Sequence, residues 1–83
     1  DSKSNNAAVA QILNHDYATA LNTLQNVKKP DATTYYLKAI VGARTNQQQQ
    51  VMDNLRQAIK LDRKMLDRAK NDLEFSAFNL TYL

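Results

Sequence analysis

One local pattern recurs along this chain. The segment from His15 to Leu21 lies in a helix-turn-helix pattern. Residues 46–52, about 31 residues later, have the same position in a second such pattern. A fixed period of roughly 20–50 residues is typical of proteins built from stacked repeats. Such repeats mostly present a surface to another molecule and rarely carry out chemistry. The pattern therefore predicts a repeat architecture with a binding role.

The composition favours helices. Glycine and proline occur once each in 83 residues, so few positions would break a helix, and cysteine is absent. No stretch alternates between apolar and polar residues over a useful length, as a strand would. A chain of this length forms one small domain at most. We therefore predict a single all-α domain over residues 1–83 with about five helices.

Turn and cap residues divide the chain into these helices. Asn14-His15-Asp16 and Thr45-Asn46 read as turns, because these residue types tolerate left-handed or capping conformations. Pro30 ends the second helix after Lys28 and Lys29, and Asp31 caps the third. Gly42 lies inside the third helix, where glycine costs about 1 kcal/mol relative to alanine. We therefore expect Gly42 to mark a close contact between two helices.

The fourth helix ends in Ala58-Ile59-Lys60-Leu61-Asp62, which resembles the close of a tetratricopeptide repeat, where Ala-Leu-x-Leu-Asp-Pro is typical. Four other positions of that unit, and Ala58 itself, align without gaps with the large and small residues of the family: Tyr35, Ala39, Val51 and Leu55. Upstream, Asn5-Asn6-Ala7-Ala8 and Asp16-Tyr17-x-x-Ala20-Leu21 are similar to the starts of the two helices of a repeat. The chain departs from the pattern at Lys38, Gly42 and Arg63, where leucine, tyrosine and proline are common.

The resemblance implies a short right-handed superhelix of helix-turn-helix units. Repeat one would span about residues 4–29, repeat two about 32–62, and a C-terminal helix about 63–80 would close the stack. It implies a scaffold that binds a protein or peptide, or the remainder of a longer parent chain. The style of the sequence suggests a C-terminal fragment of a bacterial protein from the cell envelope or periplasm.

In this architecture the first helix of each unit lines the concave surface. The candidate groove residues are Asn6, Val9, Leu13, Thr33, Tyr36, Leu37, Ile40 and Arg44. Tyr and Arg are favoured at interfaces, and Asn6 and Arg44 are suited to hold a peptide backbone or a carboxylate. The alternative for Tyr36 and Ile40 is that they belong to the ordinary core between helices.

The end of the chain is a second candidate surface. Phe75, Phe78, Leu80 and Tyr82 exceed what one helix buries against one neighbour. They form either an apolar interface for assembly or dimerisation, or a segment that folds back onto a small core.

A third hypothesis is binding of nucleic acid by a basic face. The net charge is +3, and Arg56, Lys60, Lys64 and Arg68 recur every four residues. A helix break near Asp62 would divide this stripe, and acidic residues interleave with it, as in the pair of Lys70 and Glu74. We expect such exposed pairs to be solvated.

No residue set predicts catalysis. His15 is the only histidine, and neither a nucleophile motif nor metal-ligand spacing accompanies it. We therefore expect a protein that is not an enzyme and holds no cofactor or metal. No apolar run reaches the roughly 18 residues of a membrane span.

Overall fold

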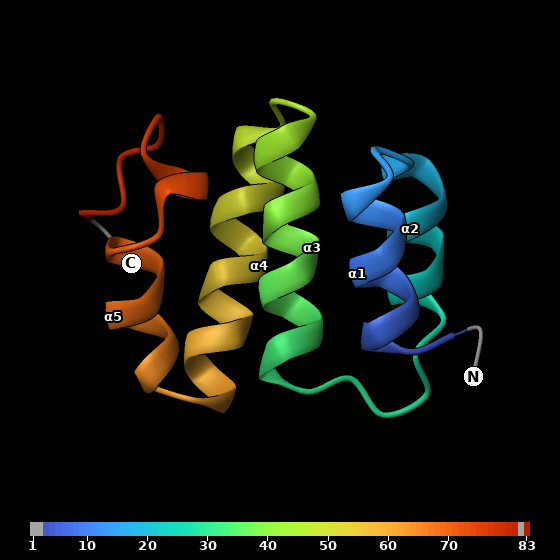
Figure 1. The fold of residues 1–83 in the computed structure, drawn as a ribbon. Helices are drawn as coiled ribbons and strands as arrows, with labels where there is room; N and C mark the ends of the chain where they lie inside the picture. The colour runs from blue at the N-terminus through green and yellow to red at the C-terminus, as the bar shows by residue number, and fades with distance from the viewer. Residues whose placement is uncertain (1–2, 82) are drawn as a thin grey trace.

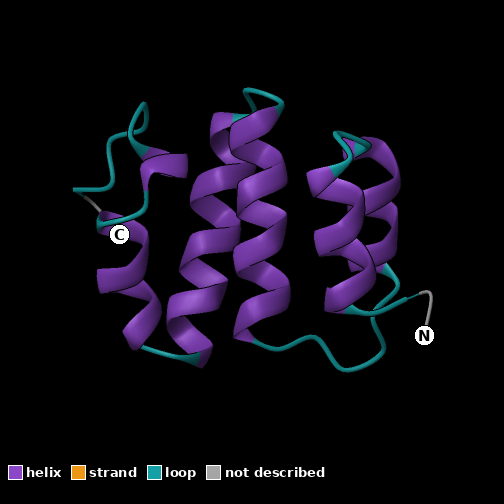
Figure 2. Ribbon diagram, in the orientation of Figure 1, coloured by secondary structure: helices purple, strands orange, loops and turns teal. Residues whose placement is uncertain are grey.

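The structure is a computed structural model that describes residues 3–81 and 83. Its elements are α1 (Asn5–Leu13), α2 (Tyr17–Gln25), α3 (Ala32–Arg44), α4 (Gln48–Leu61), α5 (Lys64–Lys70) and a 3-10 helix η1 (Leu73–Phe75). The described residues contain no strand (Figure 2). The prediction of an all-α fold with five helices is confirmed.

Two helical hairpins lie side by side. α1 pairs with α2, α3 pairs with α4, and α5 with η1 packs against the second pair (Figure 1). One apolar cluster joins the first hairpin to α3 through Ala8, Ile12, Leu24, Leu37 and Val41. A larger one joins α3 and α4 to α5 and η1. The core therefore runs through the stack, and α3 contributes to both clusters. The right-handed superhelix stays a prediction.

The turns inside the two hairpins have the same geometry. His15 has φ 60° and Asn46 has φ 57°, and each lies in the left-handed region two residues before the next helix begins. Asp16 N donates to Gln11 O at 2.9 Å, and Gln47 N donates to Gly42 O at 2.7 Å. These bonds satisfy carbonyl groups that the helix ends leave open. α2 and α4 begin 31 residues apart, at Tyr17 and Gln48, which is the spacing of the sequence pattern, whereas α1 and α3 begin 27 residues apart, at Asn5 and Ala32.

Gly42 allows α3 and α4 to approach closely. A Cβ atom at this position would lie 3.1 Å from Gln50 Cβ and 3.2 Å from Val51 N. The expected close contact is therefore confirmed, and glycine's cost in helix propensity is offset by the packing that it permits.

Asp31 caps α3 and links it to the first hairpin. The Asp31 carboxylate accepts from Thr34 N at 2.9 Å, and Thr34 Oγ1 accepts from Asp31 N at 3.1 Å, which completes a capping box. Asn5 at the start of α1 donates to Asp31 Oδ1 at 3.1 Å and accepts from the buried Thr34 hydroxyl at 2.9 Å. The backbone hydrogen bond from Thr34 is the main reason why the pKa of Asp31 is lowered.

Replacing Asp31 by alanine is expected to lower the free energy of unfolding by about 2 kcal/mol, the upper end for loss of a helix cap. The same change at Asp16, which caps α2 through a longer 3.4 Å bond at an exposed site, is expected to cost about 1 kcal/mol or less. Urea denaturation of the two variants measures both effects. An equal or larger loss for Asp16→Ala would contradict this account of the α3 cap.

Two helices are shorter than predicted. α2 ends at Gln25 and does not continue to Lys29, because the Asn26 side chain turns back to donate to Asn22 O at 2.7 Å. The prediction of one helix over residues 63–80 is wrong beyond Lys70. There the Asn71 side chain donates to Asp67 O at 2.8 Å, and Asp72 accepts from Glu74 N at 3.0 Å to begin η1. Polar side chains that bond to the nearby backbone compete with helix continuation in this way.

Candidate peptide-binding groove

A small hollow opens between α1 and α3, beside η1. Its volume is about 180 Å³, and it is lined by Val9, Ile12, Leu13, Leu37, Ile40, Arg44 and Glu74. Five of these residues are among the candidate groove residues of the sequence analysis: Val9, Leu13, Leu37, Ile40 and Arg44. The structure therefore brings most of the predicted groove together at one place.

The hollow has an apolar floor and an apolar rim. Leu37 is buried and Ile40 is half-buried, and both come from α3. On the α1 side Leu13 is 74% exposed and Val9 is 39% exposed. Leu13 and Val9 are two of the few large apolar side chains that face solvent in the described part of the chain. A hollow with such a rim removes apolar area from water when a partner side chain fills it.

The three remaining candidate residues lie elsewhere. Asn6 and Thr33 are exposed near the starts of α1 and α3 and do not line the hollow. Tyr36 is only 1% exposed, so the alternative that it is a core residue is the correct one, and its place in an open groove is wrong.

η1 and α5 cover Tyr36. Its hydroxyl donates to Asp72 Oδ2 at 2.6 Å, and its ring meets Phe75 edge to face with 5.5 Å between centroids. The Arg68 guanidinium lies 4.4 Å from the ring centroid on Tyr36. Burial, and then the bond to Asp72, raise the pKa of Tyr36 well above its ordinary value of 10.0, so the phenol stays neutral. These contacts hold Tyr36 between α3, α5 and η1, outside the lining of the hollow.

Arg44 forms the charged edge of the hollow. Its Nε and Nη2 donate to the two carboxylate oxygens of Glu74 at 2.8 and 2.6 Å. Its Nη1 donates to Tyr17 Oη at 3.0 Å, and Tyr17 Oη in turn lies 2.9 Å from His15 Nδ1. The hydrogen bonds from Arg44 lower the pKa of Glu74, although partial burial opposes the shift. Arg44 is therefore positioned to hold a carboxylate, and in this structure the carboxylate is the chain's own.

Sequence reasoning missed the role of Glu74. The expected partner was Lys70, four residues away, whereas Arg44 is 30 residues away in the chain. Spacing along one helix carries no information on this pair, because the turn at Asn71 redirects the chain before Glu74. Of the two residues, the sequence analysis named only Arg44 as a candidate groove residue.

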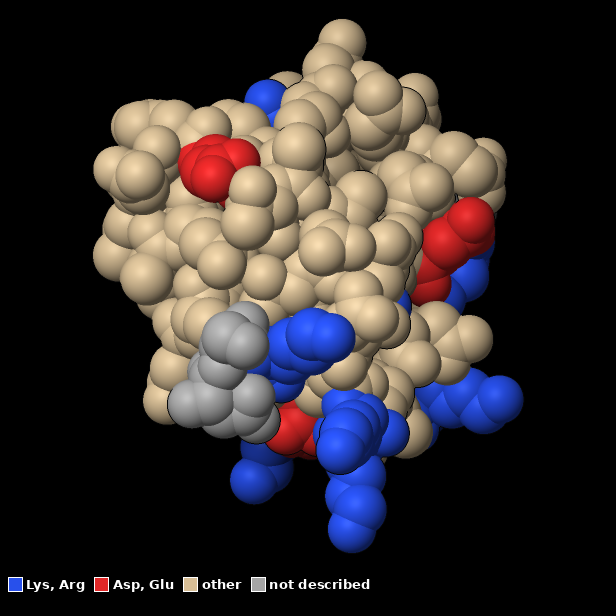
Figure 3. All heavy atoms as spheres, turned by 90° about the vertical axis from the view of Figure 1, so that its right-hand side faces the viewer, with Lys and Arg blue, Asp and Glu red and all other residues tan. Residues whose placement is uncertain are grey.

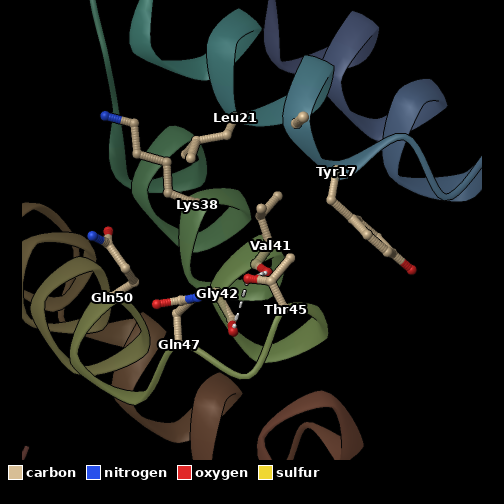
Figure 4. A pocket seen from close by; sticks show the side chains of 9 residues that line it. Tyr17, Leu21, Lys38, Val41, Gly42, Thr45, Gln47 and Gln50 are labelled. Carbon is tan, nitrogen blue, oxygen red and sulfur yellow. Dashed lines mark hydrogen bonds between the residues drawn. The ribbon is translucent and has the colours of Figure 1, made fainter.

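A second hollow, of about 300 Å³, lies between α2, α3 and the turn before α4. Figure 4 shows Leu21 and Val41 on its apolar side and the longer Lys38, Gln47 and Gln50 side chains around it. The Tyr17 ring points away from the other labelled side chains. Flexible polar side chains surround this hollow, and it lacks the exposed leucine that marks the rim of the first one.

A group of basic side chains lies at one end of the α1–α2 side of the molecule (Figure 3). Figure 3 shows lysine and arginine side chains grouped at the lower end of the α1–α2 side. Most of the rest of that side is uncharged. A hollow between the start of α1 and the loop after α2 is lined by Lys3, Lys28 and Lys29. The predicted basic stripe from Arg56 to Arg68 is divided as expected, because α4 ends at Leu61 and α5 begins at Lys64.

The aromatic C-terminal segment folds back. Phe75 is 2% exposed and Leu80 is 9% exposed, and both belong to the larger core cluster. Phe78 is half-buried and packs against the same cluster. Tyr82, the fourth predicted interface residue, lies outside the described residues. Of the two alternatives for this segment, the structure therefore favours packing against its own domain.

Comparisons of the chain with known protein families, with curated proteins and with solved structures give no match. The resemblance to tetratricopeptide repeats therefore stays a prediction. Within residues 3–81 and 83, no three His, Cys, Asp or Glu side chains are grouped so that they could hold a metal ion. No helix in the described part of the chain has both the length and the apolar character needed to cross a bilayer.

Proposed function

We propose that this chain is a non-catalytic helical-repeat module of the tetratricopeptide type that binds a peptide segment of another protein. The observation that supports the proposal most is the hollow between α1 and α3, which is lined by five predicted groove residues, the exposed Leu13 among them. The repeated turn geometry at His15 and Asn46 supports the repeat character.

The size and lining of the hollow favour a peptide over a small molecule. Pockets that enclose small ligands usually measure about 300–1,000 Å³, and this hollow has about 180 Å³. Such a volume suits one or two apolar side chains of a longer ligand. Arg44 beside it adds a directional group of the kind that anchors interfaces.

The two competing hypotheses have less support. An assembly role through the C-terminal aromatics requires exposed side chains, and Phe75 and Leu80 are buried. Binding of nucleic acid requires a continuous basic face, and the stripe of Arg56, Lys60, Lys64 and Arg68 is divided between two helices.

Replacing Leu13 by serine is expected to weaken binding of peptides selected on the unmodified chain from a displayed random library. The loss is expected to be about tenfold, because an apolar contact worth about 1.4 kcal/mol disappears. Leu61→Ser is the matched control, since both leucines are the last residue of their helix and both are exposed. Fluorescence polarisation with a labelled selected peptide measures the affinities.

Selection of no peptide by the unmodified chain would contradict the proposal. Equal losses of affinity for Leu13→Ser and Leu61→Ser would also contradict the assignment of the site to the hollow.

A further inference from the structure

The hollow already contains a carboxylate. Glu74 meets Arg44 through two hydrogen bonds, with 34% of the Arg44 side chain and 26% of the Glu74 side chain exposed. A two-point contact of this kind is the geometry by which arginine recognises a carboxylate in general. In the described structure, however, the third nitrogen of Arg44 is engaged by Tyr17. Glu74 therefore occupies the edge of the guanidinium formed by Nε and Nη2, and a ligand carboxylate can form the same two-point contact there only after Glu74 has left.

We propose that the groove takes an acidic peptide, in which an apolar residue lies next to a carboxylate, and that Glu74 is an internal competitor for Arg44. This inference rests on the proposed function and specifies its ligand. The apolar residue enters the hollow between Leu13 and Ile40, and the ligand carboxylate replaces that of Glu74 on the guanidinium.

The exchange does not require η1 to unfold. The backbone of Glu74 is held by Asp72, which accepts from Glu74 N at 3.0 Å, and the neighbouring Phe75 stays in the core. Only the partly exposed Glu74 side chain has to rotate into water. Exposed side chains change rotamer within nanoseconds, so this step does not limit binding.

Arg44 stays in position during the exchange. Tyr17 Oη accepts from its Nη1 at 3.0 Å and does not depend on Glu74. The guanidinium is therefore oriented towards the hollow before the ligand arrives, and orientation of this kind lowers the entropic cost of binding.

Exchange is favoured over simple addition because of charge. The negative charge of Asp72 disfavours the ionised form of Glu74, and the hydrogen bonds from Arg44 offset this effect. A ligand carboxylate placed next to Glu74 on the same guanidinium would add a third negative group there. Like charges at short range disfavour each other, so the ligand carboxylate and Glu74 exclude one another on Arg44.

The test uses a fluorescently labelled peptide with the sequence of residues 72–78, Asp-Leu-Glu-Phe-Ser-Ala-Phe, which places a leucine beside a glutamate. A second peptide with asparagine and glutamine in place of its two acidic residues serves as the neutral probe. We expect Glu74→Gln to bind the acidic probe about fivefold more tightly than the unmodified chain, the value of one exposed ion pair. The neutral probe is expected to bind the two proteins equally.

Two further variants link the effect to Arg44. Combining Glu74→Gln with Arg44→Gln is expected to remove the gain for the acidic probe. Asp67→Asn is the matched control, because it also converts an exposed carboxylate near the C-terminus to an amide but lies on α5. Asp67→Asn is expected to leave the affinity for the acidic probe unchanged. That result would show that a change in net charge alone does not produce the gain.

The inference is overturned if the acidic probe binds Glu74→Gln and the unmodified chain equally, or binds neither. It is also overturned if Asp67→Asn gives the same gain. In each case the proposed function stands as long as library peptides bind at the Leu13 rim. Conversely, failure of the library selection contradicts the proposed function itself.

Discussion

Replacing Phe75 by alanine is expected to lower the free energy of unfolding by about 3–5 kcal/mol, the usual cost of removing a buried phenylalanine side chain. Phe75 is 2% exposed and packs edge to face on Tyr36, and both residues belong to the larger cluster. A domain of 83 residues has a total stability of about 4–12 kcal/mol. The substitution therefore removes a large share of the stability, and urea denaturation monitored by circular dichroism measures the change.

Leu73→Ala is the control for this experiment. Leu73 lies two residues earlier in the same 3-10 helix and is 87% exposed, so its truncation is expected to change the free energy of unfolding by about 0.5 kcal/mol or less. Similar small effects for both residues would contradict the packing of η1 on Tyr36. They would also return the C-terminal aromatics to the hypothesis of an assembly interface.

Replacing Gly42 by leucine is expected to lower the free energy of unfolding by about 2–3 kcal/mol, at the upper end of typical overpacking effects. The first atom of the new side chain would lie 3.1 Å from Gln50 Cβ and 3.2 Å from the backbone nitrogen of Val51. Neither neighbour can move without displacing α4. The better helix propensity of leucine offsets only about 0.8 kcal/mol of this cost.

Ala10→Leu is the control, since Ala10 is exposed on α1 and its substitution tests helix propensity without a packing conflict. It is expected to change stability by about 0.5 kcal/mol or less. Thermal unfolding followed by circular dichroism compares the two variants. A Gly42→Leu protein as stable as Ala10→Leu would contradict the close approach of α3 and α4.

Most of the features that the sequence predicted correctly are local. His15 and Asn46 lie at turns because their types adopt positive φ with little strain. Asp31 begins α3 because its side chain reaches the backbone three residues later. Each of these features depends on neighbours within a few residues of the chain, which is why inspection of the sequence is sufficient to find them.

The features that the sequence did not predict depend on contacts between distant residues. The sequence left Tyr36 open between a groove and the core, because the residues that cover it, Asp72 and Phe75, lie 36 and 39 residues away. The turn at Asn71 was missed because apolar residues continue beyond it at spacings that a helix would also show. The pairing of Arg44 with Glu74 follows from that turn, so one local error concealed the charged edge of the candidate site.

The central claim is that a peptide binds in the hollow between α1 and α3. The most direct test is NMR of the methyl-labelled chain with a selected peptide, in which intermolecular nuclear Overhauser effects identify the methyl groups that contact the ligand. The account predicts contacts to Leu13, Ile40 and Val9, which line that hollow. Contacts confined to Leu21 and Val41, which line the second hollow, would contradict it.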